Sequence, residues 1–239
     1  MAKGKLYLIP SPLGEYDPSE VIPPQVLERL KEIRKYVVEE ARTARRYLSA
    51  AGLKGHVAEL EFHELNEHTE PAEVEALLSM FSDPDGSPTD VGLVSEAGLP
   101  AVADPGARLV ALCHDHGIKV VPMVGPSSLM LALMGSGLNG QSFAFCGYLP
   151  AKADERRKAI REIERRSSQL NQTEIFIETP YRNDSMMADL LAALQPETRL
   201  CVAADITLPD ETILTKSVRH WRRTPFTIGK RPCVFLILA

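Results

Sequence analysis

The sequence predicts an α/β protein built from two domains. Short apolar segments rich in Val, Ile, Leu and Phe alternate with longer amphipathic segments along the 239 residues, a pattern typical of parallel sheets covered by helices. Three strand-like segments crowd into residues 199–239, where hairpins would pair them antiparallel. We therefore expect an N-terminal α/β domain over 1–123 with a mainly parallel sheet, and a C-terminal α/β domain over 124–239 with a mixed sheet.

The individual elements follow from these patterns. Strands are expected at 6–9, 36–39, 91–95, 119–123, 142–147, 174–178, 199–204, 211–216 and 233–239. Helices are expected near 24–34, 41–51, 71–81, 105–116, 127–134, 154–168 and 182–194. Ser127 can begin a helix, and Asp104 is expected to cap a helix that starts at Pro105.

Composition limits the possible class of protein. The chain is 44% hydrophobic and 25% charged, as in ordinary soluble proteins, and no apolar run approaches the roughly 20 residues that span a bilayer. The start of the sequence lacks the pattern of a signal peptide, so we expect a cytoplasmic protein without a membrane partner. The formal charge of −5 argues against broad electrostatic affinity for nucleic acid but leaves room for a local basic groove.

The cysteines offer no metal site. Four of them are spread singly through apolar or strand-like segments, without the spacing of a zinc or redox motif. We interpret them as reduced packing residues. They are Cys113, Cys146, Cys201 and Cys233.

The candidate ligand-binding segments are four loops that follow predicted strands: residues 10–16, 95–106, 124–128 and 178–182. Their glycines would let a ligand approach the backbone, and their prolines have no N–H to donate, which disfavours a phosphate cradle. The oxygens of these loops suit a ligand with cationic and hydroxyl groups, such as S-adenosylmethionine. The alternative is that they are ordinary turns between strands and helices. The glycines are Gly14, Gly98 and Gly125, and the polar side chains are those of Ser95, Glu96, Ser127 and Ser128.

Eight segments, taken in order, match a known family. They are LYLIPSPLGE, VEEARTARRYLSAAGL, LNEHTE, LVSEAGLPAVADPG, VGPSSLMLALMGSGL, FCGYLP, IFIETPYR and AADITLPDE, covering about residues 5 to 215. Together they resemble the tetrapyrrole (corrin and porphyrin) methylase superfamily. Within it they are most similar to the branch that methylates a cytidine ribose 2′-hydroxyl in small-subunit ribosomal RNA. The sequence lacks the additional C-terminal helical region of that branch.

The resemblance implies a two-domain α/β fold, usually dimeric, with S-adenosylmethionine bound in the cleft between the domains. Carried over by position, it implies that the cofactor contacts Pro12, Ser95, Glu96, Ala97, Ser127, Ser128, Glu178, Asp205 and Pro232. No bound metal is expected.

The departures from the family pattern concern the substrate. Ala151, Tyr181, Ala204 and Leu208 stand where the RNA-methylating branch usually has cationic or histidine side chains, and this change weakens attraction for phosphate. Two basic segments offer compensation: residues 151–166 and RHWRR at 219–223, whose tryptophan could stack on a base. The alternatives are a solvated amphipathic helix for the first segment and an exposed basic loop for the second.

The sequence therefore leaves three functions open, and the leading one is an RNA methyltransferase. In that function the protein methylates a ribose 2′-hydroxyl of small-subunit ribosomal RNA, at a site formed by residues from separate segments. Glu40 or Glu178 would accept the hydroxyl proton, and Arg42 would hold a phosphate. An ion pair between these segments is the structural alternative. The other two readings are a tetrapyrrole precursor methyltransferase and a cofactor-binding protein without catalysis.

Overall fold

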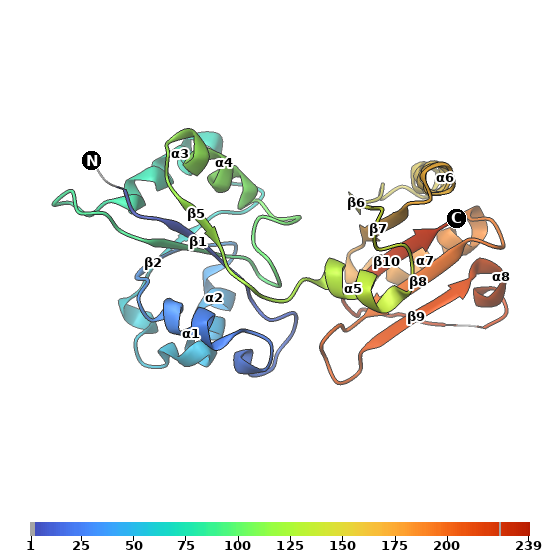
Figure 1. Ribbon diagram of the computed structural model, residues 1–239, viewed down its shortest axis with the longest axis horizontal. Helices are drawn as coiled ribbons and strands as arrows, with labels where there is room; N and C mark the ends of the chain where they lie inside the picture. The colour runs from blue at the N-terminus through green and yellow to red at the C-terminus, as the bar shows by residue number, and fades with distance from the viewer. Residues whose placement is uncertain (1–2, 225) are drawn as a thin grey trace. The chain divides into compact units, whose positions relative to one another are not determined.

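Two five-stranded sheets organise the chain, one in each half of the sequence (Figure 1). The computed structural model describes residues 3–224 and 226–239. Its chain divides into two compact units, Met1–Ser127 and Ser128–Ala239. Each unit is described by itself below.

The first unit is a parallel sheet with the strand order β3-β2-β4-β1-β5. Its strands are β1 (Leu6–Ile9), β2 (Lys35–Val38), β3 (Glu61–Glu64), β4 (Val91–Val94) and β5 (Val120–Pro122). Its α-helices are α1 (Pro24–Leu30), α2 (Ala41–Leu48), α3 (Pro71–Ala76) and α4 (Ala107–Asp115). Shorter helical turns cover Pro18–Glu20, Ser49–Leu53, Val57–Glu59 and Leu77–Phe81.

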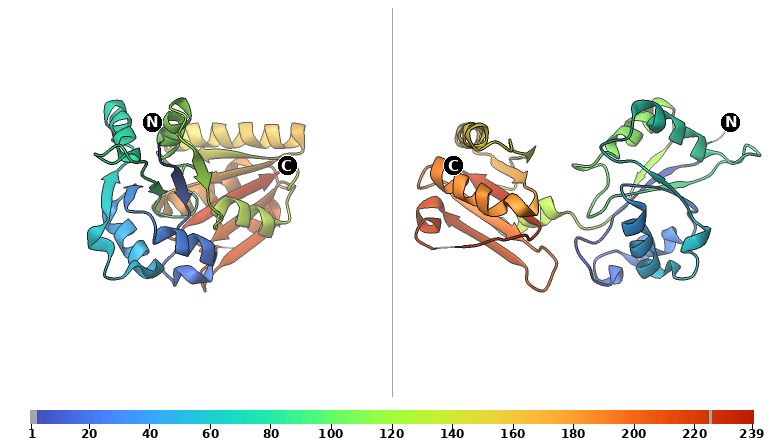
Figure 2. Two further views of the ribbon diagram at one scale, coloured as in Figure 1. Left: turned by 60° about the vertical axis from the view of Figure 1, so that its left-hand side comes forward. Right: turned by 180° about the vertical axis from the view of Figure 1, so that it is seen from behind.

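Helices cover both faces of this sheet, α1 and α2 on one side and α3 and α4 on the other (Figures 1 and 2). Because side chains alternate along a strand, Tyr7 and Ile9 pack with the first pair of helices. Leu6 packs with the second pair. The carboxyl ends of the parallel strands therefore lie along one edge, where the loops expected to bind a ligand emerge.

The second unit is a mixed sheet with the strand order β6-β7-β10-β8-β9. Only β6 and β7 run parallel, and the remaining neighbours are antiparallel. The strands are β6 (Phe143–Tyr148), β7 (Thr173–Ile177), β8 (Arg199–Ala204), β9 (Thr212–Ser217) and β10 (Cys233–Leu238). The helices are α5 (Ser128–Ser136), α6 (Ala153–Leu170), α7 (Asn183–Ala193) and α8 (Val218–Trp221), with a short turn at Pro180–Arg182.

The main core of the second unit lies under α6, α7 and α8, where Ile160, Leu190 and Trp221 meet Phe176 and Phe235 of the sheet. Helix α5 packs on β8, β9 and β10. Phe143 and Phe145 of β6 remain exposed, at 40% and 38% of the residue surface.

Three expectations about the elements were wrong or incomplete. Strand β3 was missed because three of its four residues, EFHE, are polar, and it lies at the sheet edge beside β2. Helix α4 begins at Ala107 rather than Pro105, and Gly106 is its N-cap. Residues 219–223 do not form an exposed loop, since α8 extends to Trp221 and that side chain is buried at 1% exposure.

Candidate functional site

The loops that follow β1 and β4 are fastened to each other at the carboxyl edge of the first sheet. The backbone N–H of Ser11 donates to the carbonyl of Gly98 at 2.9 Å, and the N–H of Gly98 donates back at 3.1 Å. The Ser11 hydroxyl donates to the carbonyl of Ser95 at 3.0 Å, and the Tyr47 hydroxyl donates to the carbonyl of Pro10 at 2.7 Å. These bonds tie the two loops together and engage the N–H groups of Ser11 and Gly98 within the chain, which disfavours a phosphate cradle at these two positions.

A pocket of about 390 Å³ opens beside these loops. Three of the predicted cofactor contacts, Pro12, Glu96 and Ala97, line it together with Leu13 and the aromatic Tyr16. The volume lies in the range of small-molecule sites, about 300–1,000 Å³. The fourth predicted contact of this edge lies next to these residues and is buried: Ser95 donates its hydroxyl to the carbonyl of Ala97 at 3.4 Å.

Two glycines of these loops, Gly98 and Gly125, pack closely against neighbouring segments of the chain. A Cβ on Gly125 would lie 2.1 Å from Cβ of Pro10, and a Cβ on Gly98, whose φ is +75°, would lie 3.1 Å from Leu13. The absence of a Cβ at these glycines makes room for neighbouring segments of the chain itself. That a ligand approaches the backbone at Gly98 and Gly125 stays a prediction.

The carboxylate of Asp104 holds the turn before α4. It accepts the N–H of Gly106 at 2.6 Å and that of Ala101 at 3.1 Å. Asp104 therefore stabilises the turn that leads into α4, but it lies two residues before the N-cap residue Gly106. The backbone here is strained, since Ala101 and Ala103 adopt positive φ angles of 65° and 56°.

A half-buried carboxylate that the sequence analysis passed over lies at the same edge. Glu39 follows β2 directly, and its pKa is raised by burial and then by the negative charge of Asp104. The backbone N–H of Glu96 donates to it and opposes the rise. Its place after a strand next to β4 was the only sequence signal that could have identified it.

Two of the predicted catalytic residues lie at the start of α2. Glu40 is the N-cap: its two carboxylate oxygens accept the N–H groups of Arg42 at 3.0 Å and Thr43 at 2.8 Å. The Thr43 hydroxyl adds a further bond, and these bonds lower the pKa of Glu40. Arg42 is exposed, with no ion pair among residues 3–224 and 226–239. The capping role weighs against Glu40 as a proton acceptor, because its lone pairs are engaged.

The second unit gathers three other predicted residues around the ends of β7, β8 and β10. Glu178 is buried and accepts the guanidinium N–H groups of Arg182 at 2.9 and 2.7 Å. Its other carboxylate oxygen is buried without a hydrogen-bond partner in the described part of the chain. Asp205 donates its backbone N–H to the carbonyl of Pro232 at 3.0 Å. The ion-pair partner of Glu178 within its own unit is thus the local Arg182.

The remaining predicted cofactor contacts lie where the two units meet along the chain. Ser128 is the first residue of α5, and Ser127 directly precedes it. The expectation that a helix starts here is confirmed to within one residue.

The basic residues of α6 are mostly engaged in ion pairs. Arg156 and Arg157 both bind the buried carboxylate of Asp189, each through Nε at 2.7 Å. Arg166 binds Glu174, which is fully buried in the sheet. Arg165 and Lys152 pair with acidic residues three positions away. Of the seven basic side chains in this segment, only those of Lys158 and Arg161 form no ion pair with the described residues. The structure favours the solvated, ion-paired helix over an RNA-binding face.

The second basic segment is structural. The indole N–H of Trp221 donates to the carbonyl of Leu200 at 2.9 Å inside the core. Arg222 donates to the carbonyls of Leu191 and Leu194 at the end of α7, and Arg219 pairs with Glu197. Trp221 therefore cannot stack on a base, and that hypothesis is wrong.

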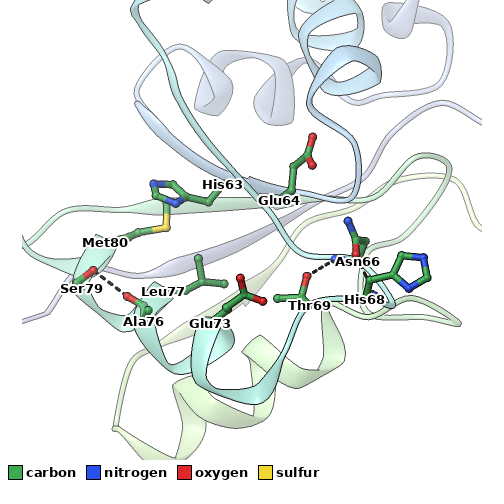
Figure 3. A pocket seen from close by; sticks show the side chains of 10 residues that line it. All are labelled: His63, Glu64, Asn66, His68, Thr69, Glu73, Ala76, Leu77, Ser79 and Met80. Carbon is green, nitrogen blue, oxygen red and sulfur yellow. Dashed lines mark hydrogen bonds between the residues drawn. The ribbon is translucent and has the colours of Figure 1, made fainter.

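A second, larger pocket of about 550 Å³ lies beside the edge strand β3 and α3 (Figure 3). It contains none of the predicted site residues. Several of its polar groups bond within the chain, since Thr69 accepts the N–H of Asn66 and Glu64 accepts the N–H of Ala41. Among the described residues no group of three or more His, Cys, Asp or Glu side chains could hold a metal ion.

Comparison with known proteins identifies the family. The family model for tetrapyrrole (corrin/porphyrin) methylases matches residues 6–220. The chain belongs to the tetrapyrrole methylase family. S-adenosylmethionine is the methyl donor of this family, and the methylase is accordingly an S-adenosylmethionine-dependent methyltransferase.

Individual relatives of the methylase carry more specific names. It is 35% identical over 215 residues to ribosomal RNA small subunit methyltransferase I of Neisseria meningitidis serogroup B, an alignment that covers 90% of this chain and 68% of that protein. It is 32% identical to the protein of the same name from Vibrio cholerae serotype O1, with 87% and 67% covered. The crystal structure of uroporphyrin-III C-methyltransferase from Thermus thermophilus, complexed with S-adenosyl homocysteine, has the same fold: the TM-score is 0.58 at 19% identity, with 98% and 97% covered.

The pocket at the carboxyl edge of the first sheet fits the cofactor of the family. Its apolar and aromatic walls suit an adenine and a methylene chain, and Glu96 supplies one negative charge for a sulfonium or ammonium group. Arg46 and Glu15 also line it, and the N–H groups of Ser11 and Gly98 are engaged between the loops. Among the described residues no helix is long and apolar enough to cross a membrane.

Proposed function

We propose that the methylase transfers a methyl group to a ribose 2′-hydroxyl of small-subunit ribosomal RNA. The observation that carries this proposal is the 30–35% identity, over most of the chain, to relatives named for that RNA. The solved tetrapyrrole enzymes share the fold at only 17–20% identity, which supports no choice of substrate. A ribosomal substrate would also require the enzyme to work in the cytoplasm, and we include that location in the proposal.

The proposed cofactor contacts in the first unit are Pro12, Ser95, Glu96 and Ala97. The pocket volume, its apolar wall and the carboxylate of Glu96 support them. Ser127, Ser128, Glu178, Asp205 and Pro232 stay as further proposed contacts. The unpartnered buried oxygen of Glu178 supports its inclusion, because such an oxygen is costly unless a ligand donates to it.

The chemistry divides among residues of this chain. S-adenosylmethionine supplies an electrophilic methyl group that leaves its sulfur without external energy input. The protein must align the ribose oxygen with that methyl and remove the hydroxyl proton. Of the glutamates after β2, Glu39 suits proton transfer better than Glu40, because its raised pKa moves it toward the working pH while Glu40 is held by the N–H groups of α2. Arg42 is proposed to hold a phosphate next to the acceptor.

We also propose that the enzyme is a homodimer. Large apolar side chains of α5 and β6 are exposed in the second unit, which supports an interface formed by these elements. They are Met130, Met134, Phe143, Phe145 and Tyr148.

A methyl-transfer assay tests the proposal. The protein is incubated with labelled S-adenosylmethionine and small ribosomal subunits from a strain that lacks it, and label should appear in ribose. Label in a tetrapyrrole precursor instead would establish the second reading of the sequence. Cofactor binding without transfer to either acceptor would establish the third.

Cofactor binding has its own measurement. At 100 times the dissociation constant the cofactor should stabilise the fold by about 2.7 kcal/mol, which raises the melting temperature by roughly 5–10 °C. Glu96→Gln should weaken binding about tenfold, because it removes one charge-assisted contact. Glu59→Gln, an exposed carboxylate outside the pocket, is the control and should bind as the wild type does. Equal affinity of Glu96→Gln and the wild type would contradict the assignment.

A further inference from the structure

Helix α2 presents a row of arginines to solvent. Arg42, Arg45 and Arg46 occupy positions i, i+3 and i+4, so they share one face of the helix. The opposite face is buried against the sheet through Ala44, Tyr47 and Leu48. An open groove of about 640 Å³ continues this face, and we call it the α2 basic groove. It is lined by Arg45, Arg46, Ser49, Ala50, Lys54 and Gly55, with Val57 and Ala58.

The charges of this groove are not neutralised within the chain. Over residues 3–224 and 226–239, Arg45 and Lys54 make no ion pair, and Arg46 approaches only Glu15 at 3.6 Å. That pair is exposed at 63% and 93%, so it contributes little. Helix α2 contains no acidic residue that could pair along it. In α6, by contrast, acids spaced three positions away neutralise the bases.

The groove is preorganised for an anionic partner. The guanidinium carbon of Arg45 lies 4.7 Å from the centre of the Phe62 ring, a contact that orients the group while its N–H groups form no ion pair with the described residues. The helix N-terminus itself is not available to an anion, because Glu40 and Glu64 accept the N–H groups of Ala41, Arg42 and Thr43. Anion binding here must come from the side chains.

The groove is continuous with the pocket that fits the cofactor. Arg46 and Ala50 line both of them. A polymer whose reacting unit lies at the pocket would therefore extend over the arginines of α2. The repeating phosphates of such a polymer match several arginine and lysine side chains that have no acidic partner along the groove. A local basic site of this kind explains how a chain with a net charge of −5 can bind RNA.

We propose that the α2 basic groove binds the phosphate backbone of the RNA next to the nucleotide that is methylated. This inference rests on the proposed function. It assigns Arg45 and Lys54 to RNA binding alone, because neither lines the pocket of about 390 Å³.

A pair of matched double variants tests it. Arg45→Gln with Lys54→Gln removes one arginine and one lysine from the groove. Lys158→Gln with Arg161→Gln removes the same charges from exposed, unpaired positions of α6 within the described residues. Binding of a labelled transcript of small-subunit ribosomal RNA is measured over a range of salt concentrations, and S-adenosylmethionine binding is measured on the same samples.

The groove variant should bind the transcript roughly tenfold more weakly at 0.15 M salt. The slope of log K against log salt should become shallower by about 1.4, as expected when two phosphate contacts to a single strand are lost. Its cofactor affinity should match the wild type, and the α6 variant should match the wild type in both measurements. Arg45→Lys should retain the salt slope, because the charge is kept.

The inference is overturned if the groove variant binds RNA as tightly as the wild type does, or if the α6 variant is the one whose RNA binding weakens. In either case cofactor binding and methyl transfer by the wild type leave the proposed function standing. Failure of the wild type to bind S-adenosylmethionine would instead remove the proposed function, whatever the RNA result. A circular dichroism melt of each variant separates loss of contact from loss of fold.

Discussion

At the scale of single residues, two adjacent glutamates differ because of what surrounds them. Burial, and then the charge of Asp104, raises the pKa of Glu39. Hydrogen bonds from Thr43, first from its hydroxyl and then from its backbone, lower the pKa of Glu40. The same side chain therefore opposes folding when it is charged at position 39 and supports folding when it is charged at position 40.

These opposite shifts predict opposite effects of one substitution. The folded chain holds the Glu39 proton to a higher pH than the unfolded chain, so this residue lowers stability as the pH rises through that range. Glu39→Gln should raise the melting temperature at pH 8 and change it little at pH 4. Glu40→Gln should lower it at pH 8, and this difference should shrink as the pH falls through the lowered pKa of Glu40. Thermal melts at both pH values would contradict the account if the two variants shifted in the same direction at pH 8.

At the scale of elements, helices α6 and α7 are joined by a buried charge network. Asp189 on α7 is 5% exposed and binds both Arg156 and Arg157 of α6. Burial alone would raise the pKa of Asp189, but the hydrogen bonds from the two arginines outweigh it and lower the pKa. The stability that this network contributes is therefore present above the usual pKa of an aspartate and is lost as the pH falls through the lowered value.

Removing one arginine should show how much the network contributes. Arg156→Met leaves Asp189 buried with only a half-exposed partner, and should lower the free energy of unfolding by about 3 kcal/mol. Arg165→Met on the same helix breaks an exposed pair with Glu162 and should cost less than about 0.5 kcal/mol. Urea denaturation measures both. If both variants lost the same free energy of unfolding, burial of the Arg156–Asp189 pair would not determine its contribution to stability.

At the scale of the whole molecule, the exposed apolar patch of the second unit predicts self-association. Met134 of α5 is 78% exposed, and Phe143 and Phe145 of the edge strand β6 are also exposed. Sedimentation equilibrium should give the mass of two chains for the wild type. Met134→Asp with Phe145→Asp should give the mass of one, because charges in the interface core are costly.

A control keeps this prediction specific. Leu170 at the end of α6 is 57% exposed and lies outside the patch, so Leu170→Asp should remain a dimer. A wild-type chain that sediments as a single copy at micromolar concentration would contradict the proposal.

Most strands and helices could be predicted from local patterns of apolar and polar residues. The apolar runs at β1, β4 and β10 predicted strands because such runs are buried on both faces of a sheet. Strand β3 escaped because an edge strand needs no apolar run, and α8 escaped because four residues are too short for a helical period. Of the site, the loop residues Pro12, Glu96 and Ala97 were expected together and line one pocket, whereas Glu39 was missed because its burial depends on neighbours far away in sequence.

The sequence by itself determined the α/β class, the order of most elements, the family and the donor-poor character of the loop at 95–106, because these follow from periodicity, residue type and motif order. Only the tertiary structure decided which charges remain available. It buries Trp221, binds the α6 bases to acids and leaves the arginines of α2 open. The physical reason is that a charge is neutralised by whichever partner lies within a few ångströms in space, and that distance depends on the packing of segments remote in sequence.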